Sequence, residues 1–228
     1  MNHDPEVSPE STIIESWNKN ADPWTEAVRQ KLIPSRRQVT DKAIIDAIIS
    51  YSPNSVLDIG CGEGWLVREL RNKKIDAVGV DVVPALIAVA KQAGGDFHLA
   101  SYSELAAGNF NLKADVAVSN FSLLGKESVE DVFHALPFLL NEHGVFIVQT
   151  LHPVMNCGDL PYEDGWREGS WNGFSADLSK PAPWYFRTLE SWIDLFNRHH
   201  LDLHELREPL NPETHKPWSV IFIAERGE

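Results

Sequence analysis

The sequence predicts an α/β protein built on a Rossmann-like, doubly wound sheet of seven strands. The sheet is expected to be mostly parallel with a C-terminal antiparallel strand, with N-terminal helices and an aromatic-rich lid insertion added to it. Between residues 55 and 151, short apolar segments alternate with helical ones, as in βαβ units with right-handed crossovers. A glycine-rich turn follows the first apolar segment and leads into a helix, which is typical of the carboxyl edge of such sheets.

Residues 1–50 are expected to form a helical lid region packed on the core, and residues 51–228 the main domain. Ile13, Ile14 and Trp17 recur at helical spacing, and a second apolar stripe runs through residues 43–48. Pro23 and Pro34 are expected to break this helical run, because proline lacks the N–H that an interior helical position needs.

The remaining elements follow from the period of the apolar residues. The expected strands are Val56–Ile59, Ala77–Val80, Phe97–Leu99, Val116–Val118, Val145–Thr150, Leu201–Leu206 and Ser219–Ala224. The expected helices are Gly64–Lys73, Pro84–Ala93, Ser103–Ala107, Ser128–Leu140 and Leu189–His199. A Pro-rich connection, Pro209–Pro217, separates the last two strands, which we expect to pair antiparallel.

Residues 152–187 interrupt the alternation. This segment holds four prolines, four glycines and seven aromatic residues, namely Tyr162, Trp166, Trp171, Phe174, Trp184, Tyr185 and Phe186. A loop of this length in a compact domain is usually functional or disordered, and its aromatic content argues against disorder. We therefore expect an ordered lid over the sheet edge.

Composition limits the partners. The chain has 228 residues, and 20 Lys and Arg against 33 Asp and Glu give a formal net charge of −13. Nucleic-acid binding depends on clustered basic residues, and no apolar stretch is long enough to cross a bilayer, so neither partner is expected. Cys61 and Cys157 do not indicate a disulfide framework, and a cytoplasmic location is expected. The oligomeric state is left open.

The strongest motif is the segment Val56–Trp65, in which a buried strand, a carboxylate at Asp58 and three alternating glycines precede a helix. Asp81 follows 21 residues after Gly60, at the end of the second expected strand, where a carboxylate can accept the hydroxyls of a ribose. The spacing is G-x-G-x-G and the next residue is Trp65, so the loop departs from the G-x-G-x-x-G pattern of dinucleotide sites.

With these residues the sequence resembles the class I S-adenosylmethionine-dependent methyltransferases, whose first motif is acidic-x-Gly-x-Gly-x-Gly. The resemblance covers about residues 40–150. It implies that the cofactor is S-adenosylmethionine and that Asp58 orients its amino group, Asp81 binds the ribose and Val82 touches the adenine. The loop beside the methionine portion would consist of Gly60, Cys61, Gly62 and Gly64.

The resemblance also implies roles for residues that follow the third and fourth strands. Ser101 and Tyr102 would lie near the adenine, where the family often has an acidic and a small residue. Asn120 and Phe121 would lie beneath the transferable methyl group. They do not form the Asn-Pro-Pro-Tyr type of sequence associated with methylation of nucleic-acid bases.

More distant segments extend the resemblance to a bacterial branch of uncharacterised small-molecule methyltransferases. These segments are Gln149–Pro153, Trp184–Trp192 and Arg207–Pro209. Arg36 precedes the helix that leads to the first strand, and its planar guanidinium is a candidate for binding the cofactor carboxylate; a solvated helix face is the alternative.

Candidate residues for the acceptor follow from their place at the expected carboxyl edge. His152, just past the fifth strand, is predicted as a general base, with a purely structural histidine as the alternative. Substrate contacts are predicted for Trp24, Trp166, Trp184 and Arg187, the tryptophans serving otherwise as apolar undersides of the lids. His and Cys do not occur at metal-ligand spacing, so no metal is predicted.

These observations predict methyl transfer from S-adenosylmethionine to a small-molecule acceptor. Three alternatives stay open: an NAD-dependent oxidoreductase, a non-catalytic cofactor-binding protein, and a methyltransferase that acts on protein or nucleic acid. The acceptor and the atom that is methylated are not specified by the sequence, because lids vary within one fold.

Overall fold

The computed structural model of the chain describes residues 8–108, 110–172, 174 and 178–227. Met1–Val7, Asn109, Gly173, residues 175–177 and Glu228 lie outside the described residues, so part of the predicted 152–187 insertion is not described.

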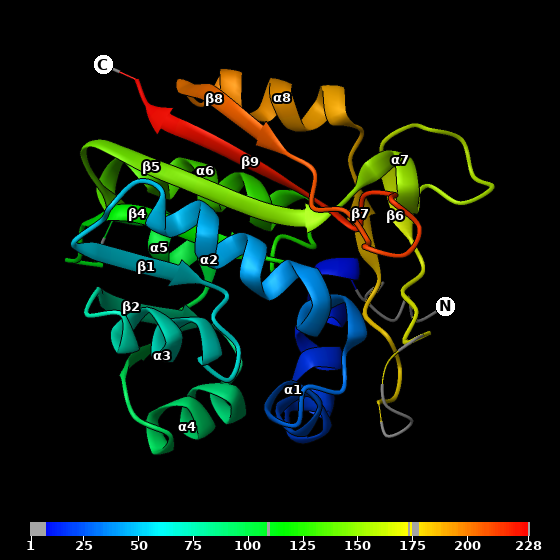
Figure 1. The fold of residues 1–228 in the computed structure, drawn as a ribbon, viewed down its shortest axis with the longest axis horizontal. Coiled ribbons are helices and arrows are strands. Elements are labelled where there is room, and N and C mark those ends of the chain that lie inside the picture. The colour runs from blue at the N-terminus through cyan, green and yellow to red at the C-terminus, as the bar shows by residue number, and fades with distance from the viewer. Residues whose placement is uncertain (1–7, 109, 173, 175–177, 228) are drawn as a thin grey trace, which may run out of the picture.

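The core is a seven-stranded sheet in the order β3-β2-β1-β4-β5-β9-β8, shown in Figure 1. Its strands are β1 (Ser55–Ile59), β2 (Asp76–Asp81), β3 (Asp96–Leu99), β4 (Ala114–Asn120), β5 (Leu140–Leu151), β8 (Leu201–Arg207) and β9 (Ser219–Arg226). The pairings among β1 to β5 are parallel, whereas β9 runs antiparallel to β5 and β8. The predicted fold class is confirmed.

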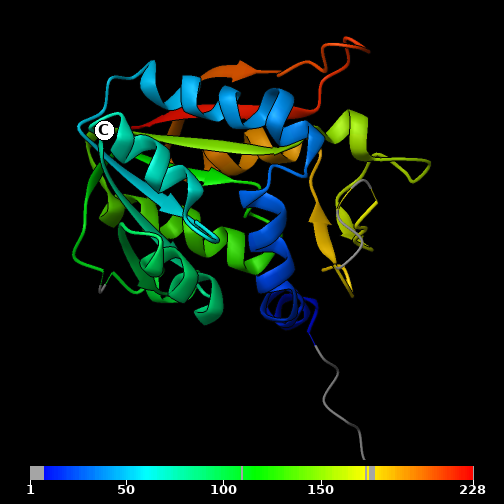
Figure 2. The ribbon, with the colours of Figure 1, turned by 60° about the horizontal axis from the view of Figure 1, so that its bottom comes forward.

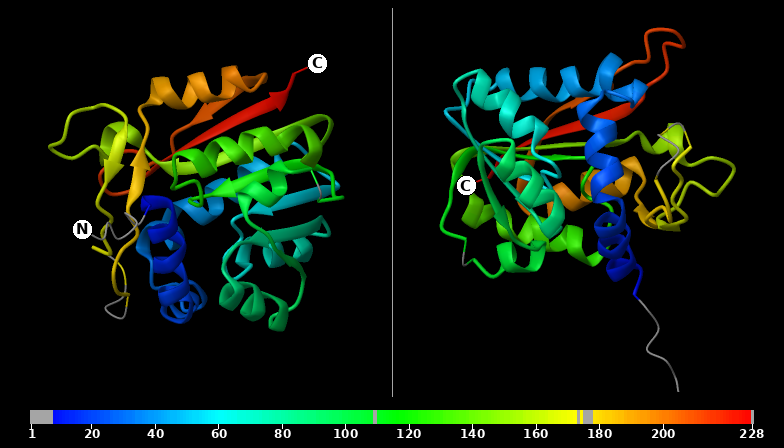
Figure 3. Two further views of the ribbon diagram at one scale, coloured as in Figure 1. Left: turned by 180° about the vertical axis from the view of Figure 1, so that it is seen from behind. Right: turned by 90° about the horizontal axis from the view of Figure 1, so that it is seen from below.

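Helices cover both faces of this sheet, as the front and back views show (Figures 1 and 3). On one face lie α2 (Asp41–Ile49), α3 (Trp65–Asn72) and α4 (Pro84–Gln92), and on the other α5 (Tyr102–Ala106), α6 (Glu127–Leu139) and α8 (Leu189–Arg198). Adjacent strand residues therefore enter different cores: Val56 packs with α2 and α3, and Leu57 packs with α6. Burial on both faces explains the continuous apolar strands.

The strand order determines where a crevice forms at the edge of the sheet. The chain builds β1, β2 and β3 outward and then returns to β4 beside β1, so the connections after β1 and β4 leave in opposite directions. In open parallel sheets a crevice forms at the carboxyl ends of two such strands. Here that crevice begins at Gly60 on one side and at Asn120 on the other.

Helix α1 (Pro9–Arg29) lies across this edge and corrects one prediction. It continues through Pro23 without a break. The carbonyl that Pro23 cannot bond belongs to Lys19, an exposed residue, so water can satisfy it. Ala21 on the same helix packs against Val83 and Leu86, and this packing offsets the cost of the missing bond.

The predicted break does occur, but it lies just before Pro34, which begins the next helical stretch. After it, a five-residue π-helix, η1 (Arg36–Thr40), runs directly into α2. The sequence did not predict this π-turn. Since Ile44 and Ile48 of α2 are buried against the sheet, α2 belongs to the core layer, while α1 extends over the edge. The domain boundary at residue 50 stays a prediction.

The insertion contains α7 (Pro153–Asn156) and a two-stranded antiparallel pair, β6 (Gly165–Arg167) and β7 (Trp184–Phe186). It lies beside α1, as Figure 2 shows. The buried Asn20 amide of α1 donates to the Ser179 carbonyl (2.7 Å) and accepts from the Ser179 N–H (2.8 Å). Ser16 Oγ also donates to the Lys180 carbonyl (2.6 Å). The two predicted coverings are therefore joined by hydrogen bonds.

In the part of the chain that the structure describes, no helix has both the length and the apolar character needed to cross a bilayer.

We expect Asn20→Ala to lower the free energy of unfolding by about 1–3 kcal/mol, because the Ser179 N–H loses its partner and the Ser179 carbonyl keeps only the bond from Trp171 Nε1 (3.2 Å). Proteolysis within residues 152–187 should accelerate as well. Asn18→Ala is the matched control, since Asn18 lies on the exposed side of α1 and bonds only within its own helix. Equal digestion rates for the two variants, in limited proteolysis followed by mass spectrometry, would show that this pair does not hold the insertion.

Candidate active site

A cavity of about 970 Å³ lies at the carboxyl edge of the sheet. The turns after β1, β2, β4 and β5 form its floor, and α1 and the insertion contribute its walls. Small-molecule sites usually measure about 300–1,000 Å³, so this volume is at the upper end of that range. The cavity can hold a nucleoside-sized ligand together with a small second molecule.

The three glycines of the loop after β1 have positive φ angles of 77° at Gly60, 57° at Gly62 and 84° at Gly64, which favour glycine. A Cβ at Gly60 would overlap Ser122, and one at Gly64 would overlap the buried Phe97 ring. At Gly62 the nearest atom would be Trp24 Nε1, at 3.8 Å. Packing therefore requires glycine at positions 60 and 64, whereas Gly62 lies where the main chain borders the cavity.

Asp81, at the end of β2, holds this loop. One carboxylate oxygen accepts from the Gly62 N–H and the other from the Val83 N–H, each at 2.8 Å. Burial raises the pKa of Asp81, and these backbone N–H donors oppose that rise. Each oxygen keeps a second lone pair, so the carboxylate can hold the loop and accept further hydrogen bonds from a ligand. Val82 beside it also lines the cavity.

Asp58, the last but one residue of β1, is buried beneath the loop. Burial and the charge of Asp81 raise the pKa of its carboxyl to about 8, and the charge of Arg36 opposes this rise. At neutral pH this carboxyl is therefore mostly protonated. A cation arriving beside it would favour the ionised form.

Arg36 enters the cavity from η1. Its Nε donates to Asp41 Oδ1 at 2.9 Å, and its Cζ lies 4.7 Å from the centre of the Trp65 ring. Its Nη2 is buried and has no hydrogen-bond partner among the described residues. An orphaned guanidinium nitrogen at a cavity wall fits the carboxylate of a ligand.

The residues predicted near the adenine also line the cavity. Ser101 is the N-cap of α5 and forms a capping box with Glu104, so its hydroxyl is already bonded within the protein. Tyr102 donates from its hydroxyl to the Ser122 carbonyl at 3.2 Å. Burial and the nearby Asp81 raise the pKa of Tyr102, so it stays neutral at physiological pH. Cys61, buried in the glycine loop, lines the same wall.

Asn120 and Phe121 lie at the end of β4, and both border the cavity. Phe121 has a φ of 56°, a left-handed conformation that costs a non-glycine residue about 1–3 kcal/mol. Its N–H donates to the Gln149 carbonyl at 2.8 Å, and the Gln149 side chain donates to Asn120 Oδ1 at 2.6 Å. Gln149 is buried and was not predicted; its only signal was an amide in an apolar strand.

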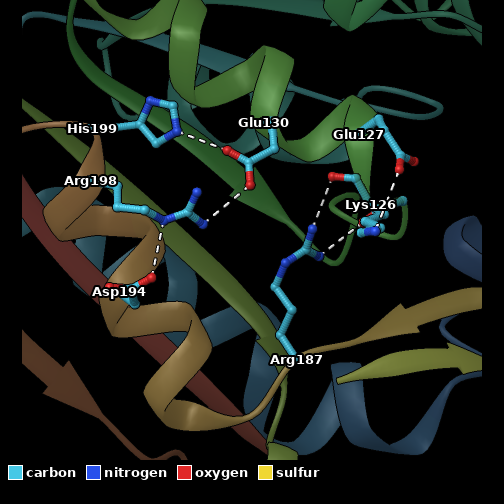
Figure 4. A network of polar contacts seen from close by, with 8 residues as sticks. Lys126, Glu127, Glu130, Arg187, Asp194, Arg198 and His199 are labelled. Atoms are coloured by element: carbon cyan, nitrogen blue, oxygen red, sulfur yellow. Dashed lines mark hydrogen bonds and ion pairs between the residues drawn. The ribbon is translucent and has the colours of Figure 1, made fainter. Parts of the chain in front are cut away.

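Of the predicted acceptor residues, Trp24 and Trp184 line the cavity. Trp166 instead packs edge to face on Tyr185, with ring centres 5.5 Å apart, and does not line it. Arg187 lines the cavity, but its Nη1 and Nη2 donate to the carbonyls of Gly125 and Lys126 at 2.9 and 3.0 Å, as Figure 4 shows. Its guanidinium thus anchors the turn before α6.

His152 is buried between β5 and α7, and its two neighbours in sequence line the cavity. The imidazole itself turns the other way: Nε2 lies 2.7 Å from Glu208 Oε1. Nδ1 is buried and has no partner among the described residues. The structure places this side chain behind the cavity wall, in contact with the connection between β8 and β9.

Two acidic residues that sequence reasoning missed attach α1 to the site. Glu10 accepts from the N–H groups of Lys126 (2.6 Å) and Glu127 (3.0 Å), at the start of α6. Glu63 in the glycine loop is 1% exposed and pairs with Arg29 of α1 at 3.1 Å and with Arg68 of α3 at 2.5 Å. The contacts of α1 with Glu63 and with the start of α6 have no local signal, because these partners are distant in sequence.

The geometry agrees with comparisons to known proteins. Residues 35–205 match a family model described as a methyltransferase domain, and the chain belongs to this family. A curated relative from Methanobrevibacter smithii, described as "Probable cobalt-precorrin-6B C(15)-methyltransferase (decarboxylating)", is 34% identical over 121 residues. That match covers 48% of this chain and 63% of the relative's length.

Solved structures show the same fold. An S-adenosylmethionine-dependent methyltransferase from Mesorhizobium loti has a TM-score of 0.61 at 20% identity, covering 81% of this chain and 96% of that one. The 1,6-didemethyltoxoflavin-N1-methyltransferase of Burkholderia thailandensis has a TM-score of 0.64 at 16% identity, covering 100% and 94%. The family match confirms the predicted methyltransferase class and favours it over the NAD-dependent alternative. The predicted S-adenosylmethionine cofactor agrees with the descriptions of these two structures.

We expect Gly64→Ala to destabilise the protein by about 1–3 kcal/mol more than Gly62→Ala. Both substitutions strain a left-handed residue to a similar extent, but only the first forces a methyl group into the Phe97 ring. Urea denaturation of the ligand-free proteins measures the difference. Equal midpoints and slopes for the two variants would contradict the division into packing and cavity-facing glycines.

Proposed function

We propose that the protein transfers the methyl group of S-adenosylmethionine to a small-molecule acceptor bound in the same cavity. The observation that carries this proposal is that Asp81 and Arg36 line one cavity around the glycine loop, with Arg36 Nη2 unpaired among the described residues and Asp58 buried beneath the loop. The three groups match, in order, a ribose, a carboxylate and an amino group.

The residues present fit this cofactor. Asp81 would accept hydrogen bonds from the ribose hydroxyls, and the chain at Gly62 would border the methionine portion. Asp58 and Arg36 offer opposite charges to a zwitterion, because a cation restores the ionised form of Asp58 and a carboxylate supplies the partner that Arg36 Nη2 lacks. Val82, Ser101 and Tyr102 are proposed for the adenine, with Cys61 beside the methionine portion.

A small acceptor is supported by the aromatic walls of the cavity. Aromatic rings from α1, the turn after β4 and the insertion face it, including Trp24, Phe121, Trp184 and Tyr185. Aromatic walls suit flat or apolar molecules. The Burkholderia enzyme, whose structure holds 1,6-didemethyltoxoflavin and S-adenosylhomocysteine, has the same fold over the full length of this chain. Trp166 would support this wall from behind through Tyr185, and Arg187 would fix the turn before α6.

S-adenosylmethionine supplies an activated methyl group, so the protein needs mainly to align the acceptor and exclude water. Asn120 and the strained Phe121, fixed through Gln149, would form the floor beneath the reacting atoms. His152 as general base stays a prediction, because it would act only if its imidazole left Glu208 and turned into the cavity. As a positioning residue it would fix the wall at Leu151 and Pro153.

The partners and location are part of the proposal. The net charge of −13 argues against a nucleic-acid acceptor, and the walls that α1 and the insertion add to the cavity argue against a protein one. Both cysteines are free, in agreement with the predicted cytoplasmic location. No metal is included; among the described residues, no three His, Cys, Asp or Glu side chains gather as ligands.

Incubation with methyl-tritiated S-adenosylmethionine and a protein-free bacterial metabolite extract tests the acceptor class. We expect label in the low-mass fraction with the native protein and a loss of about tenfold or more with Asp81→Ala, which lacks the ribose acceptor. Parallel incubations with total protein and with RNA are the comparison arms. Label in either polymer, or none above the level without enzyme, would reject a small-molecule methyltransferase.

Asp58 predicts a pH dependence. Because its pKa is about 8 in the free protein, it is mostly protonated at pH 7 and must release its proton when the amino group of S-adenosylhomocysteine binds beside it. Affinity should therefore rise between pH 6 and 8, by up to about tenfold per unit, and level off above pH 8. Calorimetry in two buffers of different ionisation enthalpy should record a proton released. Asp58→Asn should bind more weakly and lose the dependence; an identical pH profile for this variant would remove Asp58 from the site.

A further inference from the structure

We propose that Asp41 and Trp65 are positioning residues that fix Arg36, so that the site selects ligands carrying a carboxylate. This inference rests on the proposed cofactor site and deepens it. Asp41 does not line the cavity, and it acts through the guanidinium that it holds.

The π-turn makes the Asp41 contact possible. In an α-helix, residues five apart point about 140° away from each other around the axis, so their side chains do not meet. The wider η1 turn brings residue 41 under residue 36: the Asp41 N–H donates to the Arg36 carbonyl, and Arg36 Nε donates to Asp41 Oδ1 at 2.9 Å. Backbone and side chain of one residue therefore bind the same arginine.

Trp65 supports the guanidinium from a second direction. It is the first residue of α3, directly after Gly64, and its ring centre lies 4.7 Å from Arg36 Cζ. The Trp24 ring of α1 lies 5.9 Å from the same atom. A guanidinium stacks well on an aromatic face and keeps its plane fixed there. The loop, η1 and α1 thus meet at one cation.

This arrangement leaves a defined edge for a ligand. Asp41 occupies Nε, the Trp65 ring covers a face, and Nη2 is buried without a partner among the described residues. Arg36 thus lines the cavity with one terminal nitrogen unpaired, and its planar guanidinium matches the geometry of a carboxylate. Without Asp41, Arg36 would be free to pair with Asp58, whose charge it already influences. An Arg36–Asp58 pair would occupy both groups that we propose for the amino and carboxylate ends of the ligand.

Two related ligands separate positioning from general stability. S-adenosylhomocysteine carries the amino-acid end, whereas 5′-methylthioadenosine shares the nucleoside and lacks that end. We expect Asp41→Ala to weaken S-adenosylhomocysteine by about tenfold and to leave 5′-methylthioadenosine within about twofold in calorimetry. Asp41→Asn, which keeps an oxygen acceptor, should lose less. Combining Asp41→Ala with Arg36→Ala should add little to Arg36→Ala alone.

Asp46→Ala is the matched control, because Asp46 pairs with Lys42 on the exposed side of the same helix. It should bind both ligands as the native protein does. Unchanged S-adenosylhomocysteine affinity in Asp41→Ala and Asp41→Asn, or equal losses for both ligands in each variant, would overturn the positioning role. If the native protein binds 5′-methylthioadenosine and S-adenosylhomocysteine equally, selection by the carboxylate is wrong. Failure of the native protein to bind either ligand would reject the proposed function and this inference with it.

Discussion

The hydrogen bond from the Gly62 N–H to the Asp81 carboxylate is the contact on which the rest of the site depends. It ties the turn after β1 to the end of β2 and fixes the main chain at the crevice between β1 and β4. Two further carboxylates act on the same loop: Asp58 lies buried beneath it, and Glu63 binds it to α1 and α3. Three acidic side chains near each other are costly unless each has a partner. Backbone N–H groups donate to Asp81, and two arginines pair with Glu63. Asp58 is the carboxyl that we propose for the amino group of the ligand.

The cover over this loop is held by polar contacts as well as by apolar packing. From α1, Asn20 and Ser16 form hydrogen bonds with the insertion, and Glu10 accepts from the start of α6. Arg29 of the same helix forms an ion pair with Glu63. Trp17 bridges α1 and the insertion through its contact with Trp171, with ring centres 5.8 Å apart. Helix α1 therefore contacts the loop, the insertion and α6 at once, and it links the parts of the cavity that we propose for the cofactor and for the acceptor.

The mostly parallel sheet and the glycine loop could be predicted because their signals are local: apolar periodicity, glycines at fixed spacing and Asp81 at the next strand end. The path of α1 through Pro23 could not, since tertiary packing at Ala21 outweighs a local preference. Glu10, Gln149 and the π-turn at Arg36 depend on partners distant in sequence or on backbone geometry without a residue signature. Trp166 shows the same limit, because a two-stranded pair turns it toward Tyr185.

A crystal structure of the protein with S-adenosylhomocysteine tests the central claim most directly. The account predicts ribose hydroxyls on Asp81 and the amino-acid end between Asp58 and Arg36, with Arg36 still bonded to Asp41. It also predicts that Gly62 keeps its bond to Asp81, with the ligand against the main chain of the loop. A nucleoside bound elsewhere in the cavity, or an amino-acid end that contacts neither Asp58 nor Arg36, would contradict it.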